Sequence, residues 1–402
     1  MTPLVRDPGM LARMRPSPVS AIDGIGVARE GRAGVGEFYL TILPDPQACG
    51  AKEEAASVYG QLAAFLRQRG AMVAQERVYG RCEASGTIMG VRRDLLGDDL
   101  PATFIEGRPC NAGMFAGVHV VAVVPSPEIK VETITWKGVR CGRRVEIGGT
   151  TYIYLSGING LGAGGAPAQA REMFLMAQRI LEAQGGHLRS VLRTWIYIPN
   201  ILDWYPEFNR ARNEVFRVAG LLADGAAVWL PASTGIQARN PLGAECLMDV
   251  LAVLPGTARD TNIEMVISPL QNEPLAYGAA FSRGVRINDG DVSRVYVSGT
   301  ASIDRDGVTS HSNDAASQIR TTIEIIGRLL DGQGMSFVDL CQATVFFKSL
   351  RDVAKFRDLW ATIDAPPIPL VCTRGNICRK DLLFEMDAQA MGPREAASRA
   401  DD

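Results

Sequence analysis

Histidine is scarce in this sequence, and its cysteines are not spaced as metal ligands. Among 402 residues there are three histidines, His119, His187 and His311, which lie far apart, and eight scattered cysteines without a CxxC pair. Structural zinc sites and disulfide frameworks are recognised by short, regular spacings of these residue types. The sequence therefore predicts neither kind of site, and we expect no metal and no other cofactor.

An excess of one charge and a long apolar run are absent as well. The 42 Lys and Arg residues nearly balance the 44 Asp and Glu residues, so the sequence predicts no basic surface for nucleic acid. No apolar run reaches the roughly 18 to 20 residues that span a bilayer. Proline and charge interrupt the first twenty residues, unlike a signal-peptide core, and we expect a loose leader there. The sequence predicts a cytoplasmic protein that binds no membrane.

A repeated pattern orders the apolar residues, which make up 47% of the chain. Residues 151–216 and 294–360 share one order: an alternating strand ending in Ser-Gly, a polar or Gly-rich loop, an amphipathic helix that stops at glycine, a second strand and a second helix. The same skeleton is fainter over residues 36–124, where the first helix ends at Gly70 and no second helix is evident. The chain therefore contains an internal repeat of ββαβαβ type.

This repeat predicts an α+β fold in which the helices of each unit cover one face of a sheet. We expect a flexible leader, a degenerate first unit, a second unit, a C-terminal unit and a disordered tail, with boundaries at 1–35, 36–150, 151–260, 261–392 and 393–402.

Several phrases of the third unit resemble the YjgF/RidA superfamily. They are VYVSGTASID, ATVFFKSLRDVAKF, the PPIP turn and DLLFEMDAQA, and the match covers nearly all of residues 294–390. Proteins of that superfamily carry one unit per chain and form trimers with ligand sites between subunits. The resemblance implies that three tandem units form a pseudo-trimer within one chain, and a monomer is then expected.

The tandem form resembles the chorismatases within that superfamily. The phrases that carry this resemblance are WIYI with YPEFNRARNEVF, PASTGI, YGAAFSRG, VSGTASID and CRKDLLFEMD. It implies an enzyme that needs no cofactor and cleaves the enolpyruvyl ether of chorismate with release of pyruvate. The ring product would be 3-hydroxybenzoate or a dihydroxycyclohexadienoate.

Glu385 is an acid in the middle of an apolar strand, in CRKDLLFEMDAQA. Because side chains alternate along a strand, Glu385 and Asp387 share one face, opposite Phe384 and Met386. From the residues alone, that face either meets solvent or lines a cleft between units. In a cleft, burial would raise the pKa of the carboxyl and suit it to general acid catalysis. The resemblance favours the cleft, with Glu385 as the catalytic acid.

The second unit keeps this strand without the acid. Aligning the two strands puts Met248 near Glu385, so we expect one competent site per chain. Deaminases of the RidA type also carry a substrate-binding arginine two residues after a proline in this turn. Here Leu370 and Val371 follow Pro369, which argues against an enamine or imine deaminase.

Four residues inside the chorismatase-like phrases are candidates to grip the two carboxylates of chorismate: Arg283 and Arg379, with Arg212 and Tyr205 behind them. Bidentate guanidinium contacts would orient such a dianion. Any one of these arginines could instead be a solvated surface charge. In PASTGI, Ser233 and Thr234 either bind the substrate by hydrogen bonds or only form a turn.

Cys378 and Gly284 resemble residues of the chorismatases that form 3-hydroxybenzoate, and the resemblance implies that branch. Cys378 would shape the pocket or help to remove a ring proton; by residue type alone it is a small buried apolar side chain. Two other functions stay open at this point. One is a RidA-like deaminase, and the other is a non-catalytic protein that binds a small carboxylate.

Overall fold

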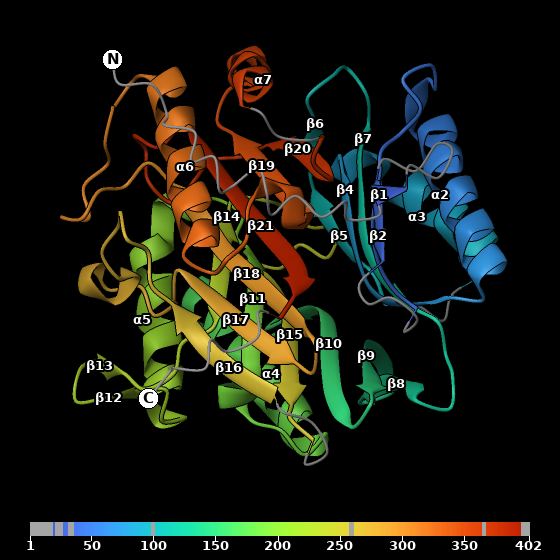
Figure 1. The fold of residues 1–402 in the computed structure, drawn as a ribbon, viewed down its shortest axis with the longest axis horizontal. Coiled ribbons are helices and arrows are strands. Elements are labelled where there is room, and N and C mark those ends of the chain that lie inside the picture. Colours follow the sequence, from blue (N-terminus) through green and yellow to red (C-terminus); the bar gives the residue numbers. More distant parts are fainter. Residues whose placement is uncertain are drawn as a thin grey trace, which may run out of the picture.

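The computed structural model contains three large sheets, with helices on their outer faces, and one short two-stranded sheet (Figure 1). It describes residues 36–97, 101–256, 261–363 and 367–394, together with the strands β1 (Val19–Ser20) and β2 (Val27–Glu30). The predicted leader lies outside these residues except for the two short strands, and so does the predicted tail from residue 395 on.

The first sheet has the strand order β1-β2-β3-β7-β4-β5. Its elements are β3 (Glu37–Ile42), α2 (Gly50–Arg69), β4 (Met72–Gly80), α3 (Ser85–Leu96), β5 (Thr103–Glu106) and β7 (Phe115–Val123). Helix α2 ends at Gly70, which adopts the left-handed conformation with φ 63°, as the predicted helix stop requires.

Helix α3 is the second helix of the first unit, which is not evident in the sequence. Its sequence, SGTIMGVRRDLL, contains two glycines, and Ile88 is its one fully buried apolar side chain. A buried ion pair adds to its packing: Arg92 Nη2 lies 2.8 Å from Glu76 Oε2 of β4. The pattern of apolar residues does not reveal an ion pair of this kind.

The second sheet has the order β14-β11-β15-β10-β9-β8. Its elements are β8 (Ile129–Trp136), β9 (Val139–Ile147), β10 (Thr150–Asn159), α4 (Ala166–Ala183), β11 (Val191–Tyr197), α5 (Ile201–Val218), β14 (Ala232–Ile236) and β15 (Leu247–Leu254). The hairpin of β8 and β9 pairs with β10, so the predicted boundary at residue 150 lies too late in the chain. The short hairpin of β12 (Leu222–Ala223) and β13 (Ala226–Ala227) follows α5.

The third sheet has the order β16-β17-β18-β21-β19-β20-β6. Its elements are β16 (Thr261–Val266), β17 (Gly284–Asp289), β18 (Val292–Ala301), α6 (Ala315–Asp331), β19 (Leu340–Phe347), α7 (Val353–Thr362), β20 (Leu370–Arg374) and β21 (Phe384–Pro393). Strand β6 (Arg108–Pro109) comes from the first unit and joins the edge of this sheet beside β20. The first unit is thereby hydrogen-bonded to the third.

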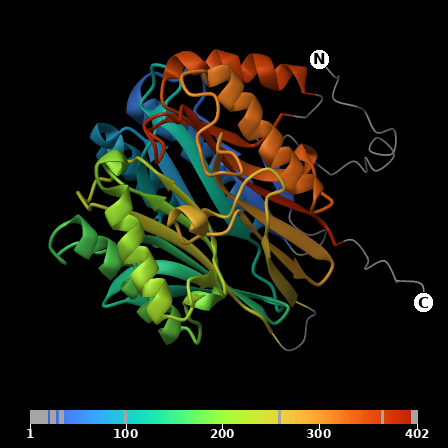
Figure 2. The ribbon, with the colours of Figure 1, turned by 90° about the vertical axis from the view of Figure 1, so that its left-hand side faces the viewer.

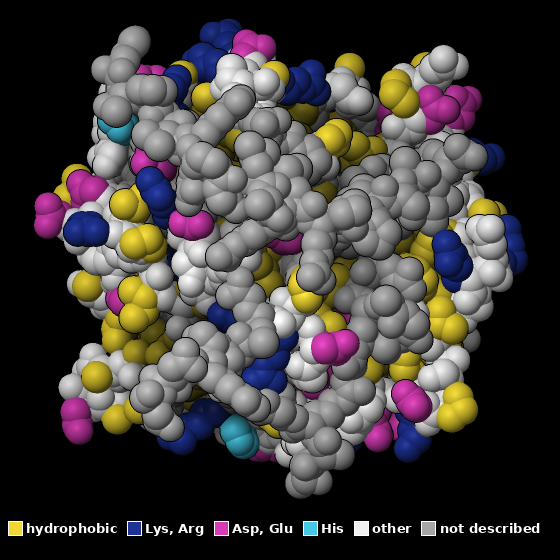
Figure 3. Space-filling view, viewed as in Figure 1, with side chains coloured by type: hydrophobic (Ala, Val, Ile, Leu, Met, Phe, Trp, Pro, Cys, Tyr) yellow, Lys and Arg dark blue, Asp and Glu magenta, His cyan; other side chains and the backbone are white. Residues whose placement is uncertain are grey.

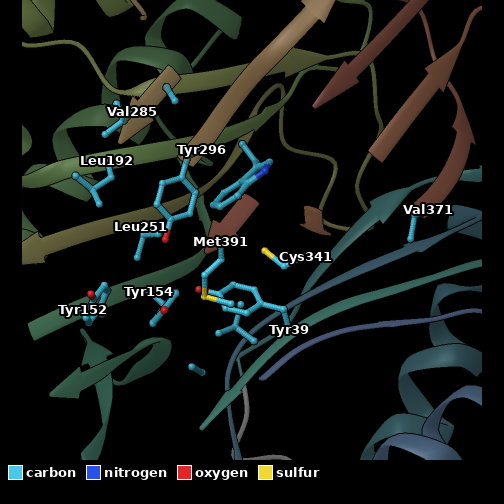
Figure 4. Packing of buried hydrophobic residues seen from close by; sticks show 14 of the residues in the cluster. Tyr39, Tyr152, Tyr154, Leu192, Leu251, Val285, Tyr296, Cys341, Val371 and Met391 are labelled. Atoms are coloured by element: carbon cyan, nitrogen blue, oxygen red, sulfur yellow. The ribbon is translucent and has the colours of Figure 1, made fainter. Parts of the chain in front are cut away.

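The registers reveal a pseudo-threefold arrangement. Tyr39, Tyr154 and Tyr296 occupy equivalent places, because they pair with Val121, Leu251 and Gln389 on the equivalent strands β7, β15 and β21. The three tyrosines are buried in one cluster with residues of all three sheets (Figure 4). The tandem pseudo-trimer expected from the sequence therefore has its inner sheet faces packed together.

The helices lie on the outside of this arrangement, as the turned view shows (Figure 2). On the face drawn in Figure 3, basic and acidic side chains are mixed, and neither sign forms a continuous field. None of the helices described above combines the length and the apolar character that a membrane span requires.

Candidate active site

A cleft opens where the second and third units meet. Strand β14 of the second unit is linked to the third unit by a bridge between Ala232 and Ser282 and by a hydrogen bond of 2.8 Å from the Ser233 amide to Ser298 Oγ. The Ser298 hydroxyl in turn donates to the Ser282 carbonyl. These contacts fix the two walls of the cleft relative to each other.

The cleft encloses a cavity of about 30 Å³, and both polar and apolar side chains line it. Its lining comes from α5, β14, the segment before β17, β18, the loop after β20 and β21. The lining residues are Tyr205, Arg212, Ser233, Gly235, Tyr277, Phe281, Arg283, Gly299, Ala301, Ile303, Cys378 and Glu385. Six of the nine predicted site residues are among them.

Glu385 lies at the floor of the cleft and is only 4% exposed. Strand β21 turns Phe384 and Met386 into the apolar layer under α6, so Glu385 and Asp387 face inward as the alternation predicts. The solvent-facing interpretation of this strand face is therefore wrong. Gly299 makes room for the acid, because a Cβ atom at this position would collide with Glu385 Oε1.

Burial raises the pKa of Glu385 from 4.5 to about 8, and the nearby Asp387 carboxylate adds to the rise, while Arg193 opposes it. A carboxyl with this pKa keeps its proton at neutral pH. It is thus a proton donor that lines a cleft, which is the arrangement of a general acid.

Cys378 faces the same cleft as a neutral thiol. Burial raises its pKa from 9 to about 12, and the proximity of Glu385 contributes. At neutral pH the sulfur is therefore not a thiolate, and its chemistry is that of a small apolar wall with a weak S–H donor. Of the two roles expected for Cys378, shaping the pocket agrees better with this protonation state.

Arg212 and Tyr205 form the wall contributed by α5. Arg212 is 3% exposed, its Nη2 donates to Asn209 Oδ1 at 2.6 Å, and its guanidinium lies 5.5 Å from the centre of the Phe281 ring. Tyr205 stacks on Phe208 with ring centres 6.2 Å apart. Both are therefore parts of a packed wall, and Arg212 is not a surface charge.

Arg283 and Arg379 differ in their distance from the cleft. Arg283 is 2% exposed, lines the cleft, and donates through Nε and Nη2 to the carbonyl of Asn272 at 2.9 and 2.7 Å. Arg379 is not among the lining residues: its guanidinium lies 5.0 Å from the centre of the Tyr277 ring, and its Nη1 donates to the Gly307 carbonyl. Arg283 can reach a bound anion directly, whereas Arg379 supports Tyr277.

Ser233 and Thr234 are strand residues of β14 with different surroundings. Ser233 lines the cleft and accepts a hydrogen bond from Thr194 Oγ1 at 2.8 Å. Thr234 points to the other side, where its hydroxyl donates to Asp387 Oδ2 at 2.8 Å. PASTGI therefore contains a strand, and its interpretation as only a turn is wrong. Thr234 does not line the cleft but donates its hydrogen bond to Asp387.

Gly284 does not line the cleft, which corrects the expectation that it contacts the substrate. A Cβ atom there would lie 3.1 Å from the Tyr296 carbonyl oxygen and 3.4 Å from Val266 Cβ, on the side away from the Arg283 side chain. Gly142 holds the equivalent place in the second unit, where a Cβ atom would collide with the Tyr154 carbonyl oxygen. The close approach of two strands explains both glycines.

Comparisons with known proteins agree with this architecture. Residues 271–391 match a family model described as Endoribonuclease L-PSP. A curated relative, the 3-hydroxybenzoate synthase of Streptomyces hygroscopicus, is 28% identical over 225 aligned residues, which cover 50% of this chain and 64% of that protein. A solved chorismatase structure superposes with a TM-score of 0.58 at 18% identity, over 79% of this chain and 92% of that one. The chain has the chorismatase fold.

The alignment to the curated relative thus spans less than two thirds of that protein's length. The YjgF gene product of E. coli aligns with 32% of this chain and 97% of its own, at 18% identity and a TM-score of 0.26. The chorismatase fold expected from the sequence phrases is confirmed by the superposition that covers most of both chains.

Sequence reasoning missed several residues of the cleft in this chorismatase fold. Tyr277 and Phe281 belong to the phrase YGAAFSRG, which was singled out only for its arginine and glycine. Gly299 is the glycine of the Ser-Gly strand end, which was interpreted as a turn. Arg193 was overlooked as well, although an arginine inside the apolar strand RTWIYI is as unusual as Glu385 in its own strand.

Metal ligation finds no support in the described part of the chain, where no three His, Cys, Asp or Glu side chains are grouped as ligands.

His119, for which the sequence shows no partner, is buried and contacts Thr41 Oγ1 at 2.9 Å and the Ala343 carbonyl at 3.1 Å.

Proposed function

We propose that the protein is a chorismatase-type enzyme, which cleaves the enolpyruvyl ether of chorismate, releases pyruvate and forms 3-hydroxybenzoate. One observation carries the proposal: Glu385 is a buried acid with a pKa of about 8 in a cleft that two buried arginines, Arg212 and Arg283, also line. The activities for which the curated relative and the superposed structure are named support the same chemistry.

The first step is a proton transfer from Glu385 to the methylene carbon of the enolpyruvyl group. The electron pair of the C=C bond forms the new C–H bond, and the adjacent carbon becomes an oxocarbenium ion that the ether oxygen stabilises. Arg212 and Arg283 would hold the two carboxylates, because a guanidinium binds a carboxylate through two parallel hydrogen bonds. Positioning a flexible dianion in this way converts binding energy into rate.

The second step breaks the bond between the ring carbon and the ether oxygen. The neighbouring ring hydroxyl attacks that ring carbon, the ether electron pair completes the carbonyl of pyruvate, and the hydroxyl proton returns to Glu385. In the epoxide-like intermediate the C–O bond to the carbon that carried the hydroxyl then breaks. The carbon that keeps the oxygen loses its proton as the ring becomes aromatic, and the oxygen takes up a proton to give 3-hydroxybenzoate. The thiol of Cys378 beside Glu385 restricts the space for a competing water, which would give the dihydroxycyclohexadienoate.

The test is to incubate the purified chain with chorismate, to follow pyruvate and to identify the ring product by mass and chromatography. We expect pyruvate release that falls by about 10²- to 10⁴-fold in Glu385→Gln, because the general acid is lost. Glu264→Gln, at an exposed position on β16, is the matched control and should keep the wild-type rate. An undiminished rate in Glu385→Gln contradicts the proposal.

The other two functions give different results in the same experiment. A deaminase would release ammonia from 2-aminoacrylate and leave chorismate intact. A binding protein would show a higher melting temperature with chorismate and no turnover. The proposal includes a monomer, which size-exclusion chromatography can test, and the cytoplasmic location stays a prediction from the sequence.

A further inference from the structure

Two carboxyl groups share the inner face of β21. Glu385 and Asp387 are separated by one residue, so their Cα atoms are about 7 Å apart, and both side chains are 4% exposed. A negative charge on one of two neighbouring buried carboxyl groups disfavours ionisation of the other. Which of the two groups carries the proton decides whether Glu385 can act as an acid.

The surroundings of the two groups differ. Asp387 Oδ2 accepts hydrogen bonds from Arg193 Nη2 at 3.0 Å and from Thr234 Oγ1 at 2.8 Å. The Thr234 hydroxyl can donate to Asp387 because its oxygen accepts from the same Arg193 nitrogen at 2.5 Å. Arg193 has no exposed surface, so this charge pair is shielded from water. Glu385 faces the cleft instead.

The fold does not require an arginine at position 193. The registers of β4, β11 and β19 make Gln75, Arg193 and Gln342 equivalent, since they pair with the equivalent residues Val121, Leu251 and Gln389. The other two units therefore carry glutamine at this place. The arginine occurs in the unit whose neighbour contributes Glu385, which indicates a role in the chemistry of that carboxyl pair.

We propose that Arg193, with Thr234, is a positioning residue. Its ion pair with Asp387 keeps Asp387 negatively charged, so that the proton of this carboxyl pair lies on Glu385. This inference rests on the proposed function only for its kinetic consequence, since the location of the proton is a property of the free protein. Asp387 in turn keeps Glu385 neutral, because a fixed negative charge nearby disfavours a second one.

Other charged or titratable groups also face Glu385. They are Cys378 from the loop after β20, Tyr205 and Arg212 from α5, Tyr277 from the segment before β17, and Arg283 at the start of β17. Arg77 of β4, also buried, interacts with both Arg193 and Asp387. The variants below leave all of these groups in place, so a change in the titration of Glu385 reports on Asp387 and Arg193.

Infrared difference spectra of the full chain without substrate test the inference directly. In the wild type, the C=O band of a protonated carboxyl should titrate near pH 8 and be missing in Glu385→Gln. In Arg193→Gln, which introduces the residue of the other two units, Asp387 should take up a proton. A protonated carboxyl band should then persist at pH 7 in the double variant Arg193→Gln/Glu385→Gln and disappear when Asp387→Asn is added.

Kinetics give the second test. Asp387→Asn removes the neighbouring charge, so the alkaline limit of pyruvate release should move to lower pH by about one unit or more. Asp249→Asn is the matched control, because Asp249 holds the equivalent place in the second unit, and its alkaline limit should equal that of the wild type.

The outcomes separate this inference from the proposed function. An unchanged alkaline limit in Asp387→Asn, or no persistent band in Arg193→Gln/Glu385→Gln, overturns the inference even if chorismate is cleaved. If chorismate is not cleaved but the infrared bands behave as expected, the proposed function fails and the inference on the proton stands.

Discussion

Two interfaces of the pseudo-trimer share a scaffold but differ in their chemistry. The acid-bearing interface joins the second and third units at Thr234, Gly299, Asp387 and Glu385. The acid-free interface joins the first and second units, where the equivalent residues are Thr103, Gly157, Asp249 and Leu247. In both, a threonine hydroxyl donates to the aspartate across the interface, at 2.8 Å to Asp387 and 2.5 Å to Asp249.

At three equivalent positions the acid-bearing interface has a different residue from the acid-free one. It has Glu385 where the acid-free interface has Leu247, Arg193 where that interface has Gln75, and Arg283 where that interface has Cys141. The threonine and the aspartate are therefore elements of the repeat, whereas the acid and the two arginines are specific to one interface. The register also corrects the sequence alignment, since Leu247 and not Met248 is the counterpart of Glu385.

Glu385→Leu should have the largest effect, because it makes the two interfaces alike at the decisive position. Leu247 shows that the fold accepts leucine at this buried place. We expect pyruvate release to fall by about 10²- to 10⁴-fold with the loss of the general acid. Circular dichroism should show an intact fold with a melting temperature at pH 9 at or above that of the wild type, since no buried carboxylate has to form. A rate of pyruvate release within a few fold of the wild-type rate would contradict the claim that Glu385 is the acid that distinguishes this interface.

Arg283→Gln should have the next largest effect. Arg283 lines the cleft and would contact a substrate carboxylate, so its loss should raise KM roughly 10- to 100-fold, as for a hydrogen bond to a charged group. Arg379→Gln is the matched change at an arginine that also lies near Tyr277 but does not line the cleft, and it should raise KM less than about 5-fold. Equal effects of the two variants would mean that the cleft is lined differently when substrate is bound.

Asp249→Asn should have the smallest effect, and on stability alone. Burial raises the pKa of Asp249 from 3.8 to about 6, although hydrogen bonds from Thr103 and the Gly157 amide oppose the rise. Because the folded-state pKa is the higher one, the wild type binds this proton more tightly when folded. It therefore loses stability as the pH rises from about 4 through 6, by up to about 3 kcal/mol.

The asparagine variant should not show this loss, so its free energy of unfolding relative to the wild type should increase between pH 4 and pH 7 in urea titrations. Its amide oxygen can still accept the hydrogen bonds from Thr103 and Gly157. A difference between the two proteins that stays constant over this pH range would show that Asp249 is already charged in the folded state at pH 4.

The sequence was sufficient for the features that depend on periodicity. The order of strands and helices in the second and third units, the inward face of Glu385 and the absence of an acid in the second unit all follow from alternation and repeat spacing. The structure was needed for features that depend on contacts between distant segments. Arg92 of helix α3 pairs with Glu76, and Thr234 is turned towards Asp387, and neither contact leaves a local signal.

Two glycines also show that the sequence does not reveal contacts between distant segments. Gly299 and Gly284 look alike in the sequence, since each follows a polar residue beside a strand. Only the position of a hypothetical Cβ atom separates them: at Gly299 it would strike the Glu385 carboxyl, and at Gly284 it would meet a neighbouring strand. The first glycine makes space for the acid, and the second allows two strands to approach.

The covalent joining of the three units has a consequence for how such a site can evolve. In a trimer of identical chains, one codon sets three positions at once, so an arginine at position 193 would appear three times around the axis. Three copies of this guanidinium would then crowd a core that here holds Arg193 together with Gln75 and Gln342, and in which the buried Arg77 already donates to both glutamines. A single gene with three copies of the unit can change one copy and leave the others as they are. It can therefore place a costly buried charge once, where a reaction uses it.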